Sequence, residues 1–464
     1  MPHAQAAAAT AHSAAPLDRF PKPAADAVCG LTLHTGTLLR PRPSPNRPSL
    51  VDSTQPSTPG IVLGLWLLAA VLGCRSRPVA GSSGSISVFV VLDTVRADHI
   101  GVCGEARPLT PTLDALVAEG AALSCTAIAP GSWTLPSHAS FFTGLEVTEH
   151  GAHALANPPE EAEGSSRRKL GPARKLSDAH AVLAESMPAV MVSGNPVLGP
   201  SSGLSRGFRH RTVPKHFGKL YGARLVKAVQ NMLKENVRDG DLLFINIADA
   251  HTPYRSIPED HPFLSPREGL TWNQSTTDSD WFRFVSGTPD PALETRTRDL
   301  YAYGIQRADR TLGRVLDAIE AAGFSRRRLV ITSDHGEYLG EHNLLGHGHY
   351  LHDENQMVPL LVQPGTLPEG FISATAAHDL IQGQPIQERP VRVAAWPHPK
   401  KSALFDQQKF HLIQARSWTP ALEWTSDQPT PDGPLGAWLV AAKASASGVG
   451  DAELHGLLEQ LGYH

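Results

Sequence analysis

The sequence predicts an α/β fold built on a doubly wound, largely parallel sheet. Short apolar runs rich in β-branched residues recur along the chain, as expected for strands that are buried on both faces. These runs alternate with segments of helical periodicity, which is typical of parallel sheets covered by helices. The chain has 464 residues, of which 41% are hydrophobic, so it can bury one large core or two smaller ones.

The predicted strands begin at residue 86. ISVFVVLD at 86–93 is a continuous apolar run and gives the first strand. Four further strands are predicted at 188–195, 241–251, 328–337 and 358–363.

Three helices are predicted between these strands. The first covers 110–123, with Thr112 as a possible N-cap. The second begins next to Thr134 in the stretch SWTLPSHASFFTG, with the hydroxyl residue just outside the helix. The third covers 294–323, because apolar residues fall on one stripe and Gly323 supplies a stop.

The chain divides into four predicted regions. Residues 1–59 are rich in Pro, Ala and Ser and are expected to be disordered, or to be an upstream extension from a misassigned start. Residues 60–85 are expected to be an export segment and a flexible tether. Residues 86–372 form the main domain, and 373–464 form a smaller α+β subdomain.

The apolar run IVLGLWLLAAVLGC at 61–74 is short for a membrane span and fits a signal peptide. Its end, VLGC, resembles a bacterial lipoprotein box with Cys74 as the lipidated residue. A buried helix is the alternative. We therefore expect an exported protein of the cell envelope or periplasm, attached to a membrane only through a lipid at Cys74.

Charge and cysteine content exclude some partners and sites. The net charge of −4 gives no electrostatic reason to expect a nucleic acid partner. The four cysteines show no zinc-binding spacing. Cys103 and Cys125 could pair in an exported protein or could be two buried thiols.

Polar residues follow four of the predicted strands, and the carboxyl ends of parallel strands form the ligand-binding edge of such sheets. They are listed in chain order: Asp93-Thr94, Ser193-Gly194-Asn195, Asp249 with His251, and Asp334-His335. A single Asp there could be a helix N-cap, but the set favours a metal or acid–base site. Asp93, Asp334 and His335 offer oxygen and nitrogen ligands for one divalent ion, which could be Ca, Mg, Mn or Zn.

Thr134 is the candidate nucleophile. At a helix N-terminus, free N–H groups and the dipole favour an anion. A hydroxyl that touches a divalent cation there loses its proton more easily. The alternative is that Thr134 is only an N-cap.

The chain resembles the sulfatase branch of the alkaline phosphatase superfamily over residues 86–365. The motifs that carry the resemblance occur in family order: LDTVRADHIGVCGE, TPTLDALVAEG, PGSWTLPSHASFFTGLEVTEHG, VSGNPVLGPSSGLSRGF, HTPY, VITSDHGEYLGEHNLLGHG and VPLLV. The resemblance implies an alkaline-phosphatase-like doubly wound sheet with one bound divalent metal. It makes residues 86–372 the catalytic domain.

The resemblance also implies roles for individual residues. The implied metal ligands are Asp93, Thr134, Asp334 and His335. His251 would protonate the leaving oxygen, and His347 would contact the substrate anion and act in catalysis. The weaker candidates are Arg96 and His138 for catalysis and Asn195 for substrate binding or a simple turn. A second metal held by Asp249, His251 and His347 is a less favoured alternative.

Two departures from the family pattern bear on the chemistry. The family motif is C-x-P-S-R, whose Cys becomes formylglycine, whereas this chain has Thr134-Leu135-Pro136-Ser137-His138. Thr cannot form the aldehyde hydrate that expels sulfate, and it is the nucleophile in relatives that handle phosphorus. Thr94 stands where many members have a second Asp ligand, so either the metal site carries less negative charge or Thr94 reaches the metal through a water molecule.

These observations favour a metal-dependent hydrolase of sulfate or phosphate esters that uses Thr134. The expected substrate is a small-molecule, glycan or lipid ester. A phosphoryl-group transferase of the phosphoethanolamine or phosphoglycerol type is the alternative enzyme. A non-catalytic sulfatase-like binding protein is the alternative of another class.

Overall fold

The computed structural model describes residues 84–153, 173–269, 291–348 and 351–386, and three strands beyond them. The predictions for residues 1–83, including the export segment and Cys74, lie outside the described residues. The division into four regions therefore stays a prediction.

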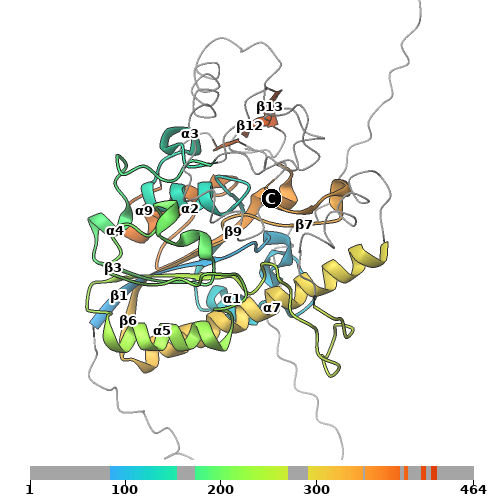
Figure 1. Ribbon diagram of the computed structural model, residues 1–464, viewed down its shortest axis with the longest axis horizontal. Coiled ribbons are helices and arrows are strands. Elements are labelled where there is room, and N and C mark those ends of the chain that lie inside the picture. The colour runs from blue at the N-terminus through green and yellow to red at the C-terminus, as the bar shows by residue number, and fades with distance from the viewer. Residues whose placement is uncertain are drawn as a thin grey trace, which may run out of the picture. The chain divides into compact units, whose positions relative to one another are not determined.

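An eight-stranded sheet in the order β10-β2-β9-β6-β1-β5-β3-β4 organises the described chain (Figure 1). Its strands are β1 (Gly84–Leu92), β2 (Ala122–Ile128), β3 (Ala189–Ser193), β4 (His210–Thr212), β5 (Leu242–Ile247), β6 (Phe324–Thr332), β9 (Met357–Gln363) and β10 (Ile372–Ser373). Only β9 runs antiparallel to its neighbours, β2 and β6, and the other pairs in this sheet are parallel. The predicted α/β fold with a largely parallel sheet is confirmed.

Smaller strands lie outside the main sheet. β7 (Tyr338–Leu339) and β8 (Leu345–Gly346) form an antiparallel pair. β11 (Val391–Ala394), β12 (Lys409–Ile413) and β13 (Pro420–Thr425) form an antiparallel sheet within the predicted C-terminal subdomain.

Helices cover both faces of the main sheet (Figure 1). Their bounds are α1 (Pro111–Ala118), α2 (Thr134–Thr143), α3 (Val147–His150), α4 (Leu183–Ser186), α5 (Ala223–Glu235), α7 (Pro291–Ala321), α8 (Asp353–Gln356) and α9 (Ala377–Gln382). Strand β1 shows the double winding, because its alternate residues enter two separate cores. Phe89 packs with α2, α4 and α9, and Val90 packs with α1, α5 and α7.

Helix α1 differs from its prediction at both ends. It ends at Ala118, and the following residues form β2, which the sequence analysis did not predict. The N-cap position is Thr110 rather than Thr112. The carboxylate of Asp309 on α7 accepts hydrogen bonds from the amides of Thr112 (2.9 Å) and Leu113 (3.0 Å) and so caps the helix from a distant part of the chain.

Helix α7 confirms the longest predicted helix. It begins at Pro291, three residues before the predicted start, and Gly323 follows it with a positive φ of 82°. That conformation suits glycine and stops the helix.

Residues at the start of the predicted C-terminal subdomain pack into the core of the main sheet. β10 pairs with β2, and Ala377, Leu380 and Ile381 of α9 are buried in the same cluster as Phe89. At least residues 372–382 therefore belong to the body that carries the main sheet.

A disulfide joins Cys103 to Cys125, which decides between the two possibilities left open by the sequence.

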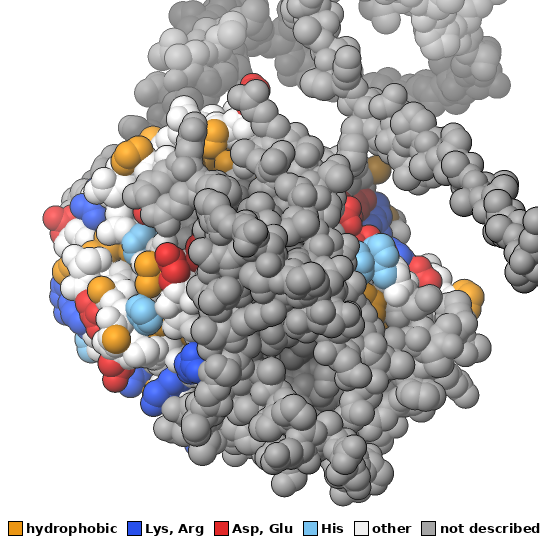
Figure 2. Space-filling view, turned by 90° about the horizontal axis from the view of Figure 1, so that it is seen from above, with side chains coloured by type: hydrophobic (Ala, Val, Ile, Leu, Met, Phe, Trp, Pro, Cys, Tyr) orange, Lys and Arg blue, Asp and Glu red, His pale blue; other side chains and the backbone are white. Residues whose placement is uncertain are grey.

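Among the described residues, no helix has the length and apolar character needed to cross a membrane. Figure 2 shows acidic, basic and histidine side chains interspersed on the described surface of one face.

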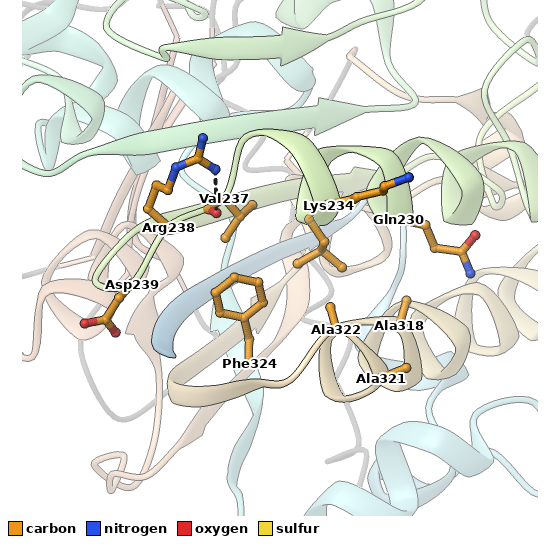
Figure 3. A pocket seen from close by; sticks show the side chains of 10 residues that line it. Gln230, Lys234, Val237, Arg238, Asp239, Ala318, Ala321, Ala322 and Phe324 are labelled. Atoms are coloured by element: carbon orange, nitrogen blue, oxygen red, sulfur yellow. Dashed lines mark hydrogen bonds between the residues drawn. The ribbon is translucent and has the colours of Figure 1, made fainter. Parts of the chain in front are cut away.

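A shallow pocket of about 560 Å³ lies between α5, α7 and the start of β6. Figure 3 shows Phe324 and the alanines of α7 along it, with Lys234 and Arg238 from the α5 side. Because Phe324 begins β6, this pocket lies at the edge where the parallel strands start. The candidate site described next lies at the opposite edge, where those strands end.

Candidate metal and nucleophile site

Asp93 follows β1 directly, and its two carboxylate oxygens have different surroundings. Oδ2 accepts hydrogen bonds from the side-chain amides of Asn195 and Asn246, each at 2.8 Å. Oδ1 is buried and has no hydrogen-bond partner. One oxygen is thus saturated, and the other is left for a ligand.

Asp334 follows β6 and repeats this arrangement with backbone donors. Its Oδ1 accepts hydrogen bonds from the amides of Thr94 and His335, each at 3.1 Å. Its Oδ2 is buried without a hydrogen-bond partner.

His335 supplies the third unsatisfied atom. Its Nδ1 lies 2.9 Å from the carbonyl oxygen of Gly336. Because a carbonyl only accepts, we assign the ring hydrogen to Nδ1, which leaves a lone pair on Nε2. That nitrogen is buried, has no hydrogen-bond partner and lies 3.4 Å from Oδ2 of Asp334.

These three atoms fit a divalent cation. Ligand atoms of Asp93, Asp334 and His335 lie within 4.8 Å of one another. When Asp334 is ionised, two buried atoms with free lone pairs face each other here, which is costly unless a cation lies near both. A mixed oxygen and nitrogen set is compatible with zinc, manganese or magnesium, and calcium favours oxygen more strongly.

The burial and mutual proximity of these three groups also shift their pKa values. Burial raises the pKa of Asp93, but its electrostatic attraction to the neighbouring His251 and His335 rings and the hydrogen bonds from Asn195 and Asn246 hold it below its ordinary value. Burial and the negative charge of Asp93 raise the pKa of Asp334 well above its ordinary value. Burial and repulsion from His347 lower the pKa of His335 to about 3, so this ring is neutral at pH 7.

Thr134 lies beside this cluster as the first residue of α2. The N-cap position is Trp133, so the structure contradicts both the placement of Thr134 just outside the helix and the N-cap alternative. The Thr134 hydroxyl oxygen accepts a hydrogen bond from Nδ2 of Asn195 at 3.0 Å. Asn195 therefore bridges Thr134 and Asp93, and its predicted role in substrate binding stays a prediction.

The turn before α2 explains why Thr134 is held there. Ser137 shares hydrogen bonds of 3.2 Å with the amide and the carbonyl of Gly131. A Cβ on Gly131 would lie 2.7 Å from Pro136, so only glycine fits this close approach. The turn fixes Thr134 as the first residue of the helix.

His251 and His347 complete the described site. Nδ1 of His251 donates to the carbonyl of Thr252 at 2.5 Å, and its buried Nε2 has no hydrogen-bond partner. The ring of Phe217 stacks on His251, with ring centroids 4.2 Å apart. The centroid of His347 lies 5.2 Å from that of His251 and 4.2 Å from that of His335. The structure thus brings both predicted histidines to the site.

His138 is buried on α2, one turn after Thr134. Its Nδ1 lies 2.9 Å from the carbonyl of Thr134 and 3.6 Å from Oδ2 of Asp334. Burial lowers the pKa of His138 to about 4, so the ring is neutral at pH 7. It cannot replace the charge of the arginine in the family motif.

Arg96 and Asp249 are engaged elsewhere. The hydrogen bonds given for the Arg96 guanidinium go to Asp98, Glu341 and the carbonyl of Glu337. Asp249 pairs with Arg307 at 2.7 Å and accepts the amide of Gly222 at 3.0 Å. Neither arrangement supports a catalytic Arg96 or a second metal on Asp249.

Four residues at or near the site were not expected from the sequence: Asn246, Phe217, Glu337 and Tyr301. Asn246 is a polar residue inside the apolar run of β5, which is a signal that it has a specific partner. Glu337 lies 3.3 Å from Nδ1 of His347 and orients that ring.

A family comparison adds an independent observation. Residues 212–379 match the family model described as Sulfatase. The match includes Asp334 and His335 and begins after Asp93 and Thr134. It supports the resemblance to the sulfatase branch of the alkaline phosphatase superfamily.

One curated relative and two solved structures are also similar to this chain. The ulvan-active sulfatase of Formosa agariphila is 24% identical over 306 residues, which cover 60% of this chain and 56% of the relative. The chain thus spans little more than half the length of that relative.

The phosphonate monoester hydrolase of Agrobacterium radiobacter has a TM-score of 0.48 and 16% identity, covering 74% of this chain and 89% of that one. The C-terminal periplasmic domain of EcEptC from Escherichia coli, in complex with Zn, has a TM-score of 0.46 and 14% identity, covering 73% and 94%.

Proposed function

We propose that this protein is a metal-dependent hydrolase of phosphate or sulfate esters in which Thr134 is the nucleophile. One observation carries the proposal. The Thr134 hydroxyl is tied through Asn195 to Asp93, and Asp93 belongs to a group of three buried ligand atoms with no hydrogen-bond partner.

Asp93, Asp334 and His335, together with the hydroxyl of Thr134, would hold one divalent ion per chain. Such an ion lowers the pKa of a neighbouring hydroxyl and offsets negative charge on a group in transfer. The ion could be Ca, Mg, Mn or Zn.

The protein groups then divide the work of the reaction. Deprotonated Thr134 attacks the phosphorus or sulfur atom, and the bond to the leaving oxygen breaks. Nε2 of His251, when protonated, gives a proton to that oxygen. His347 and the free amides at the start of α2 bind the transferred anion. Water then hydrolyses the ester on Thr134 and regenerates the hydroxyl.

We infer a preference for phosphorus over sulfur. A phosphoryl group on Thr134 can be attacked by water at phosphorus. A sulfate on Thr134 lacks the exit route that the second hydroxyl of a formylglycine hydrate provides. The expected substrate is a small-molecule, glycan or lipid ester, and the relative named for activity on ulvan makes a glycan ester one choice to include.

A panel of esters tests this function. The metal-loaded protein is assayed on matched aryl and alkyl esters of sulfate, phosphate monoester and phosphodiester. We expect turnover, with phosphorus esters faster than the sulfate ester. A rate that rises with an added acceptor alcohol would favour a phosphoryl transferase. Bound metal without turnover on any ester would favour the non-catalytic alternative.

We also propose that the protein is exported and lipid-anchored through Cys74. The disulfide between Cys103 and Cys125 supports export, since disulfides persist mainly in oxidising compartments. The mass of the N-terminal peptide from a bacterial host provides the test. A lipidated Cys74 is expected, and an unprocessed chain containing residues 1–60 would contradict the proposal.

A further inference from the structure

Thr94, next to the candidate ligand Asp93, has a backbone conformation that its residue type disfavours. Its φ is +63°, and among the described non-glycine residues only His342 shares a positive φ. A β-branched side chain is strained there and persists only where its surroundings enforce the conformation.

The positive φ of Thr94 orients its backbone amide toward the candidate metal site. It directs the Thr94 amide onto Oδ1 of Asp334 at 3.1 Å. Together with the amide of His335, it occupies that oxygen and leaves Oδ2 facing Nε2 of His335. The orientation of the Asp334 carboxylate thus depends on a strained peptide 240 residues earlier in the chain.

Tyr301 of α7 holds this peptide from the other side. Its buried hydroxyl donates to the carbonyl of Thr94 at 2.6 Å and accepts the amide of Arg96 at 3.0 Å. The hydroxyl therefore clamps both sides of the turn that follows β1. Its ring packs edge-to-face on His99, with centroids 5.0 Å apart, and a phenylalanine would keep that contact.

We propose that Tyr301 is a positioning residue for the metal centre. Its hydroxyl holds Thr94 in the left-handed conformation that turns the Thr94 amide onto Asp334. This inference rests on the proposed function only in taking Asp334 as a metal ligand. By this inference, a residue of α7 controls the orientation of the Asp334 carboxylate without touching it. Helix α7 packs on the face of the sheet opposite to α2, the helix that carries Thr134.

The test compares Tyr301→Phe with the double variant Tyr301→Phe/Thr94→Gly. Titration calorimetry with Zn²⁺ and with Mn²⁺ measures the metal Kd. Tyr301→Phe should weaken binding on the order of tenfold, as is usual when a partner behind a metal ligand is lost, while kcat at saturating metal changes little. Thr94→Gly should return the Kd to near the wild-type value, because glycine adopts a positive φ without a clamp.

Tyr303→Phe is the matched control, because it deletes a phenol hydroxyl from the same helix. It should leave the Kd unchanged. A purely structural role for Tyr301 predicts a lower melting temperature without rescue by Thr94→Gly. Unchanged metal affinity in Tyr301→Phe, or weakened affinity that glycine does not restore, would overturn the proposal.

A second measurement separates this inference from the proposed function. Amide hydrogen exchange of the peptide containing residues 93–96 is followed in the metal-free protein. We expect faster exchange in Tyr301→Phe than in the wild type or in Tyr303→Phe. If the wild type binds no metal, the proposed function fails but the clamp is still tested, and equal exchange rates would exclude it.

Discussion

Thr134→Ala is expected to reduce kcat by on the order of 10³-fold or more, since in the proposed mechanism it removes the group that forms the covalent intermediate. The fold should persist, because the Thr134 side chain does not cap α2. Steady-state rates on the best ester of the panel and far-ultraviolet circular dichroism measure the two effects. Thr134→Ser keeps a hydroxyl at the site and should retain part of the activity.

Two further variants sharpen the interpretation of Thr134→Ala. Thr143→Ala makes the same change at the other end of α2, where the hydroxyl bonds only the helix carbonyl of Ala139 and the amide of Leu145. Its activity should stay near that of the wild type. Thr134→Cys should not create a normal sulfatase, because His138 stands where the modification motif needs Arg. Near-native turnover in Thr134→Ala would mean that a water molecule, not Thr134, is the nucleophile.

Asp334→Asn is expected to weaken metal affinity by about ten- to a hundredfold or more and to lower the rate with it. The asparagine carbonyl can still accept the amides of Thr94 and His335, so its NH₂ group would face the position of the metal. An NH₂ group donates hydrogen bonds and does not ligate a cation. Calorimetric titration of metal and kinetics at increasing metal concentration measure both effects.

In the metal-free protein, Asp334→Asn should increase the stability of the fold. The pKa of Asp334 in the folded protein lies above its ordinary value, because burial and Asp93 disfavour its charge. The metal-free wild type therefore loses stability as the pH rises above the pKa of Asp in the unfolded chain. Asp334→Asn removes that loss, so its metal-free melting temperature at pH 7 should exceed that of the wild type.

Asp249→Asn is the control for the charge change. It alters another buried carboxylate at the same edge of the sheet, which pairs with Arg307. It should leave metal affinity unchanged even if it lowers stability. Equal metal affinity in Asp334→Asn and the wild type would exclude Asp334 as a ligand.

The sequence could predict the parts of the fold that have a local signature. β1 and β5 are mostly apolar runs, and α7 has a long apolar stripe, so each is predicted near its observed position. β2 has no such pattern, because Ser124 and Thr126 interrupt ALSCTAI. It is stabilised by antiparallel pairing with β9, more than 200 residues later, which no local pattern reveals.

Some residues of the candidate site could likewise be predicted from the sequence, and others could not. Asp93, Asp334 and His335 could be grouped from the sequence because they follow strands whose carboxyl ends share one edge. Asn246 could not, since its role requires the register that pairs it with Val91 beside Asp93. The ion pair of Arg96 could not be predicted either, because its partner Glu341 lies 245 residues later in the chain.

The most direct test of Thr134 as nucleophile is chemical quench of the reaction with a phosphodiester, followed by peptide mass spectrometry. The account predicts a phosphoryl group on the peptide that contains Thr134 during turnover, and its absence from Thr134→Ala. Rapid turnover of the diester with no modified peptide, or with the modification on another residue, would contradict it.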